Sequence, residues 1–324
     1  MEENIQIRKR RKKRKPKWLK VLLIIFIAFI LISIGIVAYT FYKLNNFSSD
    51  IHEPIERAEK SALRDKEVDL NRKEPLSIAL FGVDSNEERD SVGSGERSDS
   101  IILLSINPND NKTVMISIPR DTRSEIVGNN TIEKINHAYA YGGARMAIDS
   151  LENLMNIPID HYVTINMDGL EELIDVVGGV DVTSNATFTV KGNSYVEGQS
   201  YEMYGEEALA FTRSRYEDGS GGDFGRQERQ QLVVQALGEK LISIGSIGRM
   251  NSILDAVGNN VKTDLTMSDL QDIGTKYGGA RKNVERLQLE GEGATLEDGL
   301  WYFLPYDESI EEASSTYRKN LEID

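Results

Sequence analysis

The longest apolar stretch of the chain, Val21 to Tyr42, contains no charged residue. As a helix, its 22 residues would be roughly 33 Å long, enough to cross the ~30 Å hydrocarbon core of a bilayer. The stretch exceeds the ~7–15 apolar residues of a signal peptide and lacks a small-residue cleavage site. Aromatic side chains lie at its ends, at Trp18, Tyr39 and Tyr42. The pattern therefore predicts an uncleaved membrane anchor.

Beyond residue 75 the pattern changes to short apolar runs that are rich in β-branched residues and bounded by turn formers. We predict strands at 76–84, 100–108, 113–119 and 161–166. The first two have apolar residues at successive positions, which is typical of strands buried on both faces. The residues Asn107 to Asp110 predict a hairpin turn between the second strand and the third.

Helical patterns alternate with these strands. We predict helices at 136–155, 167–179, 204–212 and 224–243. The region 252–324 adds two or three helices and strands at 284–291 and 300–305. Such alternation predicts the α/β class, with an α/β/α layered domain around a mixed central β-sheet, preceded by one transmembrane helix.

Charge is divided sharply along the chain. Residues 1–20 hold ten Lys and Arg and two acidic residues. Taken from totals of 38 and 52, this leaves 28 basic and 50 acidic residues elsewhere, a net charge of −22. Because Lys and Arg beside a span stay in the cytoplasm, we predict a single-pass cell-membrane protein with an extracellular body. Its parts are a basic cytoplasmic tip (1–20), the anchor (21–42), an extracellular spacer (43–74) with a helix around Glu53–Arg64, and a large extracellular domain (75–324).

Composition excludes several function classes. The 324-residue chain has no cysteine, which excludes disulfides, thiolate metal sites and a cysteine nucleophile. Its three histidines, His52, His137 and His161, lack the spacing of a zinc site. The sequence has no G-x-S-x-G, GxxxxGK[ST] or strand-linked G-x-G-x-x-G motif. The basic tip abuts the membrane span, so we interpret it as a contact for anionic lipid and not for nucleic acid.

Charged residues gather at the predicted strand ends. Asp84 ends the first strand, Arg97 and Asp99 open the second, and Arg120 follows the third. In an extended chain, residues two apart share a face. Paired Asp84 and Asp99 with arginines nearby would hold a hard cation such as Mg²⁺ together with an anion. The alternative is a set of surface ion pairs.

A second cluster of arginines surrounds the glycine-rich loop 219–222. Asp223 is a candidate N-cap for the helix that follows, and Val233, Val234 and Leu237 form its apolar stripe. Helical spacing places Arg226 and Gln230 on the same inward face. An inward arginine in the first turn of a helix suits a bound phosphate. The alternative is a buried ion pair between Arg226 and Asp223.

Six segments follow one another in the chain: GVDS (82–85), RSDSIILLSINP (97–108), SIPRDT (117–122), KINHAYAYGG (134–143), IPIDHYVTINMDG (157–169) and RSR…GDFGRQERQQ (213–231). Together, over about 75–235, they resemble the LytR-CpsA-Psr family of cell-wall glycopolymer transferases. The resemblance implies an extracellular transferase that moves a glycopolymer such as wall teichoic acid or capsule from a polyprenyl-pyrophosphate carrier onto peptidoglycan. It also implies an α/β/α fold with an apolar pocket for the lipid.

The resemblance also implies roles for single residues. Asp84 and Asp99 match the aspartates that hold Mg²⁺, and Lys134 matches with a role left open. The residues that match the pyrophosphate-binding set are Arg97, Arg120, Arg213, Arg215, Arg226 and Gln230. Among these, Arg97 and Arg120 are expected to act on the reacting phosphate, and Asp223 or Asp121 as the base. The alternatives are a polyprenyl-pyrophosphate hydrolase and a non-enzymatic regulator of the cell envelope.

Overall fold

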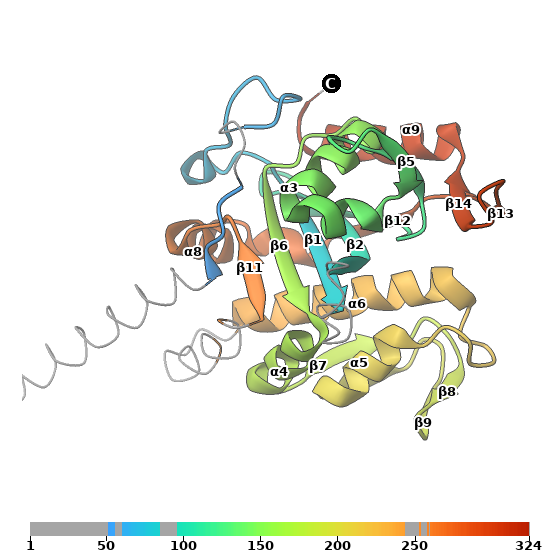
Figure 1. Ribbon diagram of the computed structural model, residues 1–324. Helices are drawn as coiled ribbons and strands as arrows, with labels where there is room; N and C mark the ends of the chain where they lie inside the picture. Colours follow the sequence, from blue (N-terminus) through green and yellow to red (C-terminus); the bar gives the residue numbers. More distant parts are fainter. Residues whose placement is uncertain are drawn as a thin grey trace, which may run out of the picture. The chain divides into compact units, whose positions relative to one another are not determined.

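The computed structural model describes residues 51–55, 60–84, 96–243, 253, 258 and 260–323. A six-stranded mixed sheet lies at the centre of this part, in the order β11–β6–β1–β2–β3–β12 (Figure 1). β1 pairs parallel with β6 and antiparallel with β2, so the predicted mixed sheet is confirmed. The strands are β1 (Leu76–Asp84), β2 (Arg97–Asn107), β3 (Lys112–Ser117), β6 (His161–Asn166), β11 (Val261–Thr263) and β12 (Val284–Gln288).

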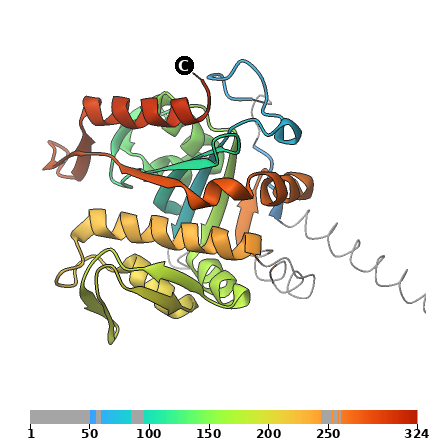
Figure 2. The same cartoon turned by 180° about the vertical axis from the view of Figure 1, so that it is seen from behind.

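Helices cover both faces of the sheet (Figures 1 and 2). On one face, α3 (Asn136–Met155) and α9 (Asp307–Asn320) pack against the sheet through an apolar core that includes Phe81 and Leu103. On the other face, α6 (Gly222–Ser243) and α8 (Met267–Lys276) pack against a second set of side chains, among them Ile102. The alternating side-chain directions of the strands thus fill two separate cores.

A further layer lies beyond α6. It contains α4 (Met167–Val177), β7 (Val180–Thr183), β8 (Phe188–Val190), β9 (Asn193–Tyr195), β10 (Ser200–Met203) and α5 (Gly205–Arg213). Val233 and Leu237 of α6 pack into the core of this layer, whereas Val234 packs against the sheet. The predicted single apolar stripe of α6 is therefore wrong, because the helix is buried on two sides.

The predicted element boundaries hold to within a few residues for most of the domain. The prediction of a helix at 136–155 is confirmed by α3, which is kinked at Gly142 and Gly143. α4 ends at Val177, with Gly178 in the left-handed conformation as its C-cap. β2 begins three residues before the predicted start, at Arg97. Short pairs complete the fold: β4 (Arg123–Ile126) with β5 (Thr131–Lys134), and β13 (Gly291–Thr295) with β14 (Trp301–Pro305).

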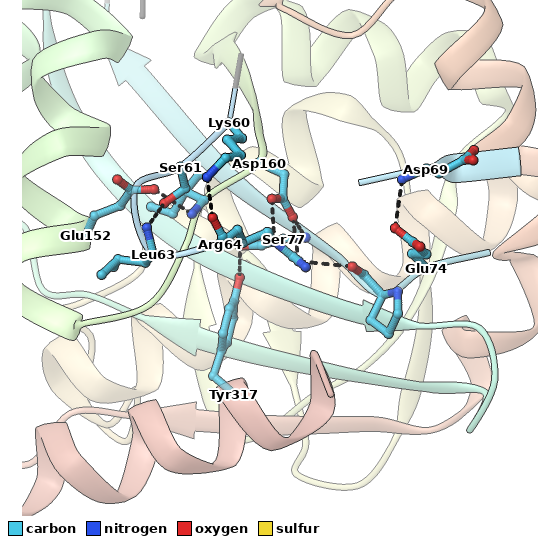
Figure 3. A network of polar contacts seen from close by, with 12 residues as sticks. Lys60, Ser61, Leu63, Arg64, Asp69, Glu74, Ser77, Glu152, Asp160 and Tyr317 are labelled. Atoms are coloured by element: carbon cyan, nitrogen blue, oxygen red, sulfur yellow. Dashed lines mark hydrogen bonds and ion pairs between the residues drawn. The ribbon is translucent and has the colours of Figure 1, made fainter. Parts of the chain in front are cut away.

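Residues 60–74, predicted as part of a spacer, pack against the sheet (Figure 3). Arg64 and Asp160 form a two-fold contact, with Nε–Oδ1 at 2.7 Å and Nη2–Oδ2 at 2.8 Å. The backbone N–H of Ser77 also donates to Asp160, while the Ser77 hydroxyl is 2.8 Å from the hydroxyl of Tyr317. A buried ion pair is stable only with such additional partners. This part of the predicted spacer is therefore bound to the domain.

The helix predicted around Glu53–Arg64 is not formed at the described residues 53–55 and 60–64. Contacts divide the chain into Met1–Phe47 and Ser48–Asp324, and all described residues belong to the second unit. Within those described residues, no helix has both the length and the apolar character that a membrane crossing requires. The predicted cytoplasmic tip (1–20) and anchor (21–42) lie outside them.

Candidate active site

A β-bulge near the start of β2 shapes one side of the site. Gly82 pairs with Ser100 and Val83 pairs with Ser98, which leaves Asp99 as an extra residue without a partner in β1. Bulges of this kind occur beside active sites because they change the direction of a side chain. Arg97 and Asp99 are both partly exposed, and the fully buried Ser98 lies between them, which is consistent with the predicted shared face. The bulge offsets Asp99 from the regular pairing with β1.

Arg120 connects the ends of β2 and β3. Its Nη1 lies 3.1 Å from Oδ1 of Asp99, and its Nε lies 3.6 Å from Oδ2 of Asp121. Lys134, at the end of β5, holds the other oxygen of Asp121 at 2.7 Å. The four side chains are between 19% and 30% exposed. They form a continuous set of ion pairs that a ligand can reach from solvent.

The arginine loop and the start of α6 supply the other side. Arg226 Nη2 lies 2.6 Å from Oδ1 of Asp223, and Arg215 Nε lies 3.4 Å from the same oxygen. The alternative of an Arg226–Asp223 ion pair is thus present in the structure. The prediction that Asp223 caps α6 is wrong, because the helix already begins at Gly222 and Asp223 lies in its first turn. There its carboxylate accepts from the Gln227 side chain at 2.9 Å.

The two sides influence each other electrostatically. Burial alone lowers the pKa of Arg120, but Asp99, Asp121 and Asp223 together outweigh it and raise that pKa. For Arg226, burial is the main cause of a lowered pKa, opposed by Asp223 and reinforced by the positive charges of Arg120 and Arg215. The cations at the two edges are thus close enough to repel one another. An anion between them would relieve that repulsion.

Arg226 also has a donor that lacks an acceptor. Its side chain is 12% exposed, and within the described residues its buried Nε makes no hydrogen bond. Buried guanidinium donors are normally satisfied, so an unsatisfied one is informative. An oxygen atom of a bound molecule is one acceptor that could satisfy it.

Gln230 links the helix to the sheet, since its Oε1 accepts from the Ser100 hydroxyl at 3.1 Å. Gln230 follows Arg226 by four residues, so one face of α6 presents both side chains toward the strand ends. The prediction that these two residues share a face is consistent with their partial burial. Ser100, which follows the bulge residue, was not singled out from the sequence.

Arg229 is a structural residue that sequence reasoning missed. It is fully buried, and its guanidinium donates to the backbone oxygens of Phe211, Ser214 and Ser220 at 3.0, 2.6 and 2.8 Å. Burial is the main cause that lowers its pKa to about 10. Its fixed position holds the loop that carries Arg215. Arg229 lies four residues before Val233, which itself lies four residues before Leu237, so helical spacing places all three on one buried face. That spacing was the sequence signal for the burial of Arg229.

The remaining predicted site residues are placed as follows. Arg97 is half-buried and pairs with Asp84 in the β1–β2 register. The side chain of Asp84 lies outside the described part of the structure. Arg213 ends α5 with an exposed side chain. The structure thus brings together Asp99, Arg120, Arg215, Asp223, Arg226 and Gln230, with Asp121 and Lys134.

No group of three or more carboxylate or imidazole side chains suited to a metal ion exists among the described residues. A magnesium ion commonly uses only one or two protein carboxylates and takes its other ligands from substrate phosphates and water. Asp99 has the oxygen chemistry for such a shared site.

The LytR_cpsA_psr family matches residues 38–319. The chain is 42% identical, over 90% of its length and 95% of the relative, to the "Polyisoprenyl-teichoic acid--peptidoglycan teichoic acid transferase TagU" of Halalkalibacterium halodurans. It is similar to the crystal structure of Bacillus subtilis TagU, with 35% identity, a TM-score of 0.64, and coverage of 78% of this chain and 99% of that one. A structure of "TagT bound to LIIa-WTA" gives 28% identity, a TM-score of 0.70, and coverage of 84% and 100%.

Proposed function

This chain belongs to the LytR_cpsA_psr family, and from that premise we propose that it transfers a teichoic-acid-type glycopolymer from a polyprenyl-pyrophosphate carrier onto peptidoglycan. The names of the relatives support the polymer and the acceptor. The observation that carries the proposal is the convergence of Arg120, Arg215 and Arg226 at one site. There Arg226 keeps a buried donor that the described residues leave without an acceptor.

The transfer is a displacement at phosphorus. A hydroxyl oxygen of peptidoglycan attacks the sugar-side phosphorus, a new P–O bond forms, and the bond to the bridging oxygen breaks. Polyprenyl phosphate leaves with the bonding electron pair, and the polymer stays linked through a phosphodiester. Negative charge grows on the leaving phosphate, so fixed arginines are the groups this reaction needs most.

The ion pairs of the site define the roles we assign. Arg97 and Arg120 act on the reacting phosphate, and Arg120 is held by Asp99 and Asp121. Arg213, Arg215, Arg226 and Gln230 bind the pyrophosphate. Arginine suits this task because its planar guanidinium can donate two parallel hydrogen bonds to phosphate oxygens.

The hydroxyl proton passes to a carboxylate. Asp223 and Asp121 are the two candidates, and each is already oriented by cationic partners, Arg226 at 2.6 Å and Lys134 at 2.7 Å respectively. Both carboxylates are partly exposed, at 28% and 20%, so an acceptor hydroxyl can approach either. The geometry is therefore compatible with either Asp223 or Asp121 as the base.

We assign Mg²⁺ to Asp84 and Asp99, which end β1 and open β2. The carboxylate donors suit a hard cation, and the small number of protein ligands leaves positions for phosphate oxygens. When bound, the ion supplies positive charge to the pyrophosphate. The protein residues that hold it also keep Arg120 in place, through the Asp99 contact.

We place the domain outside the cell membrane, with residues 1–20 inside, 21–42 as the anchor and 43–74 leading to the catalytic domain 75–324. The charge asymmetry of the sequence supports this arrangement. Protease added to intact protoplasts should digest the domain and spare the N-terminal tip. A domain that stays protected until the membrane is opened would contradict both the topology and the transfer to the wall.

The function is tested with the full chain in detergent, a polyprenyl-pyrophosphate-linked teichoic acid and uncross-linked peptidoglycan. We expect polymer attached to peptidoglycan, lost on chelation and reduced about 10²–10³-fold in Asp99→Asn and Arg226→Ala, as for other charge-stabilising groups. Free polymer formed at the same rate without acceptor would indicate a hydrolase. Absence of any turnover would indicate a regulator.

A further inference from the structure

The C-terminal hairpin of β13 and β14 lies beside the N-terminal end of α6 (Figures 1 and 2). The side-chain amide of Gln288 donates to the backbone oxygen of Phe224 at 2.8 Å. The rings of Phe224 and Phe303 meet edge to face with centroids 6.4 Å apart. Phe224, the residue that follows Asp223, is thus held by the end of β12 through Gln288 and contacts the hairpin through Phe303.

The hairpin is also attached to the end of β3. The backbone N–H of Phe303 donates to the backbone oxygen of Asp121 at 2.9 Å. Lys134, which holds the Asp121 carboxylate, places its Nζ 5.9 Å from the centre of the Tyr302 ring. Both candidate bases thus have the same hairpin as a neighbour. The hairpin is rigidly placed relative to the position where an acceptor hydroxyl must arrive.

Three aromatic side chains, Phe224, Trp301 and Phe303, form what we call the aromatic strip. Trp301 and Phe303 are two residues apart on β14, so they share one face and are about 7 Å apart along the strand. Glycines lie beneath them: a Cβ at Gly293 would be 2.5 Å from Cζ2 of Trp301, and one at Gly291 would be 2.8 Å from Cζ of Phe303. The rings therefore rest against bare backbone.

Two of the three rings are open to solvent, whereas Phe303 is only 5% exposed and packs into the core. Trp301 is 44% exposed and Phe224 is 45% exposed. Single exposed apolar residues are ordinary, but here two exposed rings flank a third that is part of the core, and one of the two, Phe224, follows the site residue Asp223. Rings held by glycine backbone and by edge-to-face contact lose little further freedom when a ligand stacks on them.

The charge around the strip restricts the occupant. The hairpin exposes Glu292, Glu297 and Asp298, and the sequence has no Lys or Arg between Arg286 and Arg318. Arg123 lies close enough to Asp298 to act on it electrostatically, and Lys134 lies beside Tyr302, so these two cations offset part of this charge. The exposed carboxylates of the hairpin still disfavour an anionic membrane surface and the polyanionic donor polymer. An uncharged sugar ring fits, because its C–H face packs on an aromatic ring while its hydroxyls can donate to carboxylates.

We propose that the aromatic strip binds the glycan strand of the peptidoglycan acceptor, with Trp301 and Phe224 stacking on successive parts of the strand. The site is then divided into a basic half for the donor phosphates and an aromatic, acidic half for the acceptor sugar. A sugar seated on Phe224 lies next to Asp223, one of the two candidate bases. This inference rests on the proposed function and adds the acceptor site to it.

Fluorescence gives a test that requires no change in the strip. The sequence contains two tryptophans, Trp18 and Trp301, so the Trp18→Phe chain reports on Trp301 alone. Uncross-linked peptidoglycan glycan oligomers should change its emission saturably, whereas soluble teichoic acid and anionic vesicles should not. The proposal would be overturned if the Trp301 emission did not change with the oligomers, or if it changed with the vesicles instead.

Kinetics distinguish this inference from the function on which it rests. Trp301→Ala should raise the acceptor KM about tenfold, the loss expected for one good aromatic contact, with kcat and the donor KM unchanged. Trp301→Phe should recover most of the loss. The matched control is Tyr204→Ala, which removes a 53% exposed aromatic residue at the N-cap of α5.

The outcomes separate cleanly. If the wild-type chain transfers polymer but the Trp301→Ala acceptor KM equals that of the control, the aromatic strip is not the acceptor site and the proposed function stands. If the donor KM rises instead, the strip binds the donor and the inference is wrong. If the wild-type chain transfers nothing, the proposed function has failed. If Trp301→Ala does not fold, the Trp18→Phe titration decides.

Discussion

Two arginines on one helix, Arg226 and Arg229, should respond to substitution in opposite ways. In Arg229→Met, three backbone oxygens lose their buried donor. Each orphaned oxygen costs at least about 1 kcal/mol. The guanidinium also lies 4.8 Å from the centre of the Phe188 ring, a cation–π contact worth about 1 kcal/mol. We therefore expect a loss of about 4 kcal/mol in the free energy of unfolding.

Arg226→Ala should cost little stability. Its partner Asp223 is 28% exposed and keeps Arg215 at 3.4 Å and the Gln227 amide at 2.9 Å. An ion pair with that much solvent contributes about 0–1 kcal/mol. The substitution also removes a buried Nε that finds no acceptor among the described residues. The change in stability should therefore stay within about 1 kcal/mol.

Urea and thermal melts of the full chain, with and without a polyprenyl pyrophosphate, measure both effects. A loss of 4 kcal/mol corresponds to a fall in Tm of roughly 8–16 °C for a domain of this size. Arg226→Ala should melt near the wild type but lose the ligand-induced rise in Tm, since that rise follows occupancy. The reasoning is refuted if Arg226→Ala melts like Arg229→Met, or if it keeps the full ligand shift.

Three further predictions concern the scaffold. Asp160→Asn leaves the buried Arg64 without an anionic partner and should lower the free energy of unfolding by about 3–5 kcal/mol, measured in urea; a loss below 1 kcal/mol would contradict this. Burial opposes the charge on His161, but its bond to Asp264 prevails and raises the pKa above 6.5. The charged His161 then contributes fully to the free energy of unfolding below pH 6.5, and this contribution is lost as pH rises through the raised pKa. In urea melts from pH 6 to 9, the wild type should therefore lose stability as pH rises, and His161→Gln should not show this loss. Gly225→Ala places a Cβ 2.2 Å from a loop backbone oxygen and should lower Tm, unlike Gly238→Ala, which meets open space.

Much of the fold was readable from periodicity. The runs at 76–84 and 161–166 became β1 and β6 with the predicted bounds. β1 is an almost uninterrupted apolar run, as expected of a strand buried on both faces, whereas β6 alternates between buried and partly exposed residues. α3 and the hairpin turn at Asn107 could also be predicted from the sequence, because helical periodicity and turn-forming residues are local signals. The two-sided burial of α6 was not, because a helix between two layers has no polar face that marks its orientation.

The site was readable in its residue types but not in its geometry. Arginine-rich and aspartate-containing segments identified the candidate residues, whereas the bulge at Asp99 depends on a register shift with β1 that no local pattern encodes. Arg229 was missed because a charged residue is expected at the surface, and its backbone acceptors come from distant segments. The role of Trp301 likewise depends on contacts across the domain.

The central claim is tested most directly by following the sugar-side phosphorus of the donor. A polyprenyl-pyrophosphate-linked teichoic acid labelled at that phosphorus is incubated with the full chain, Mg²⁺ and uncross-linked peptidoglycan. The muramidase-released fragments are then analysed by mass spectrometry. The account predicts labelled phosphorus in a phosphodiester to the glycan, with unlabelled polyprenyl phosphate released and the product lost in Arg226→Ala. Label found only in free polymer phosphate, or an unchanged yield in Arg226→Ala, would contradict it.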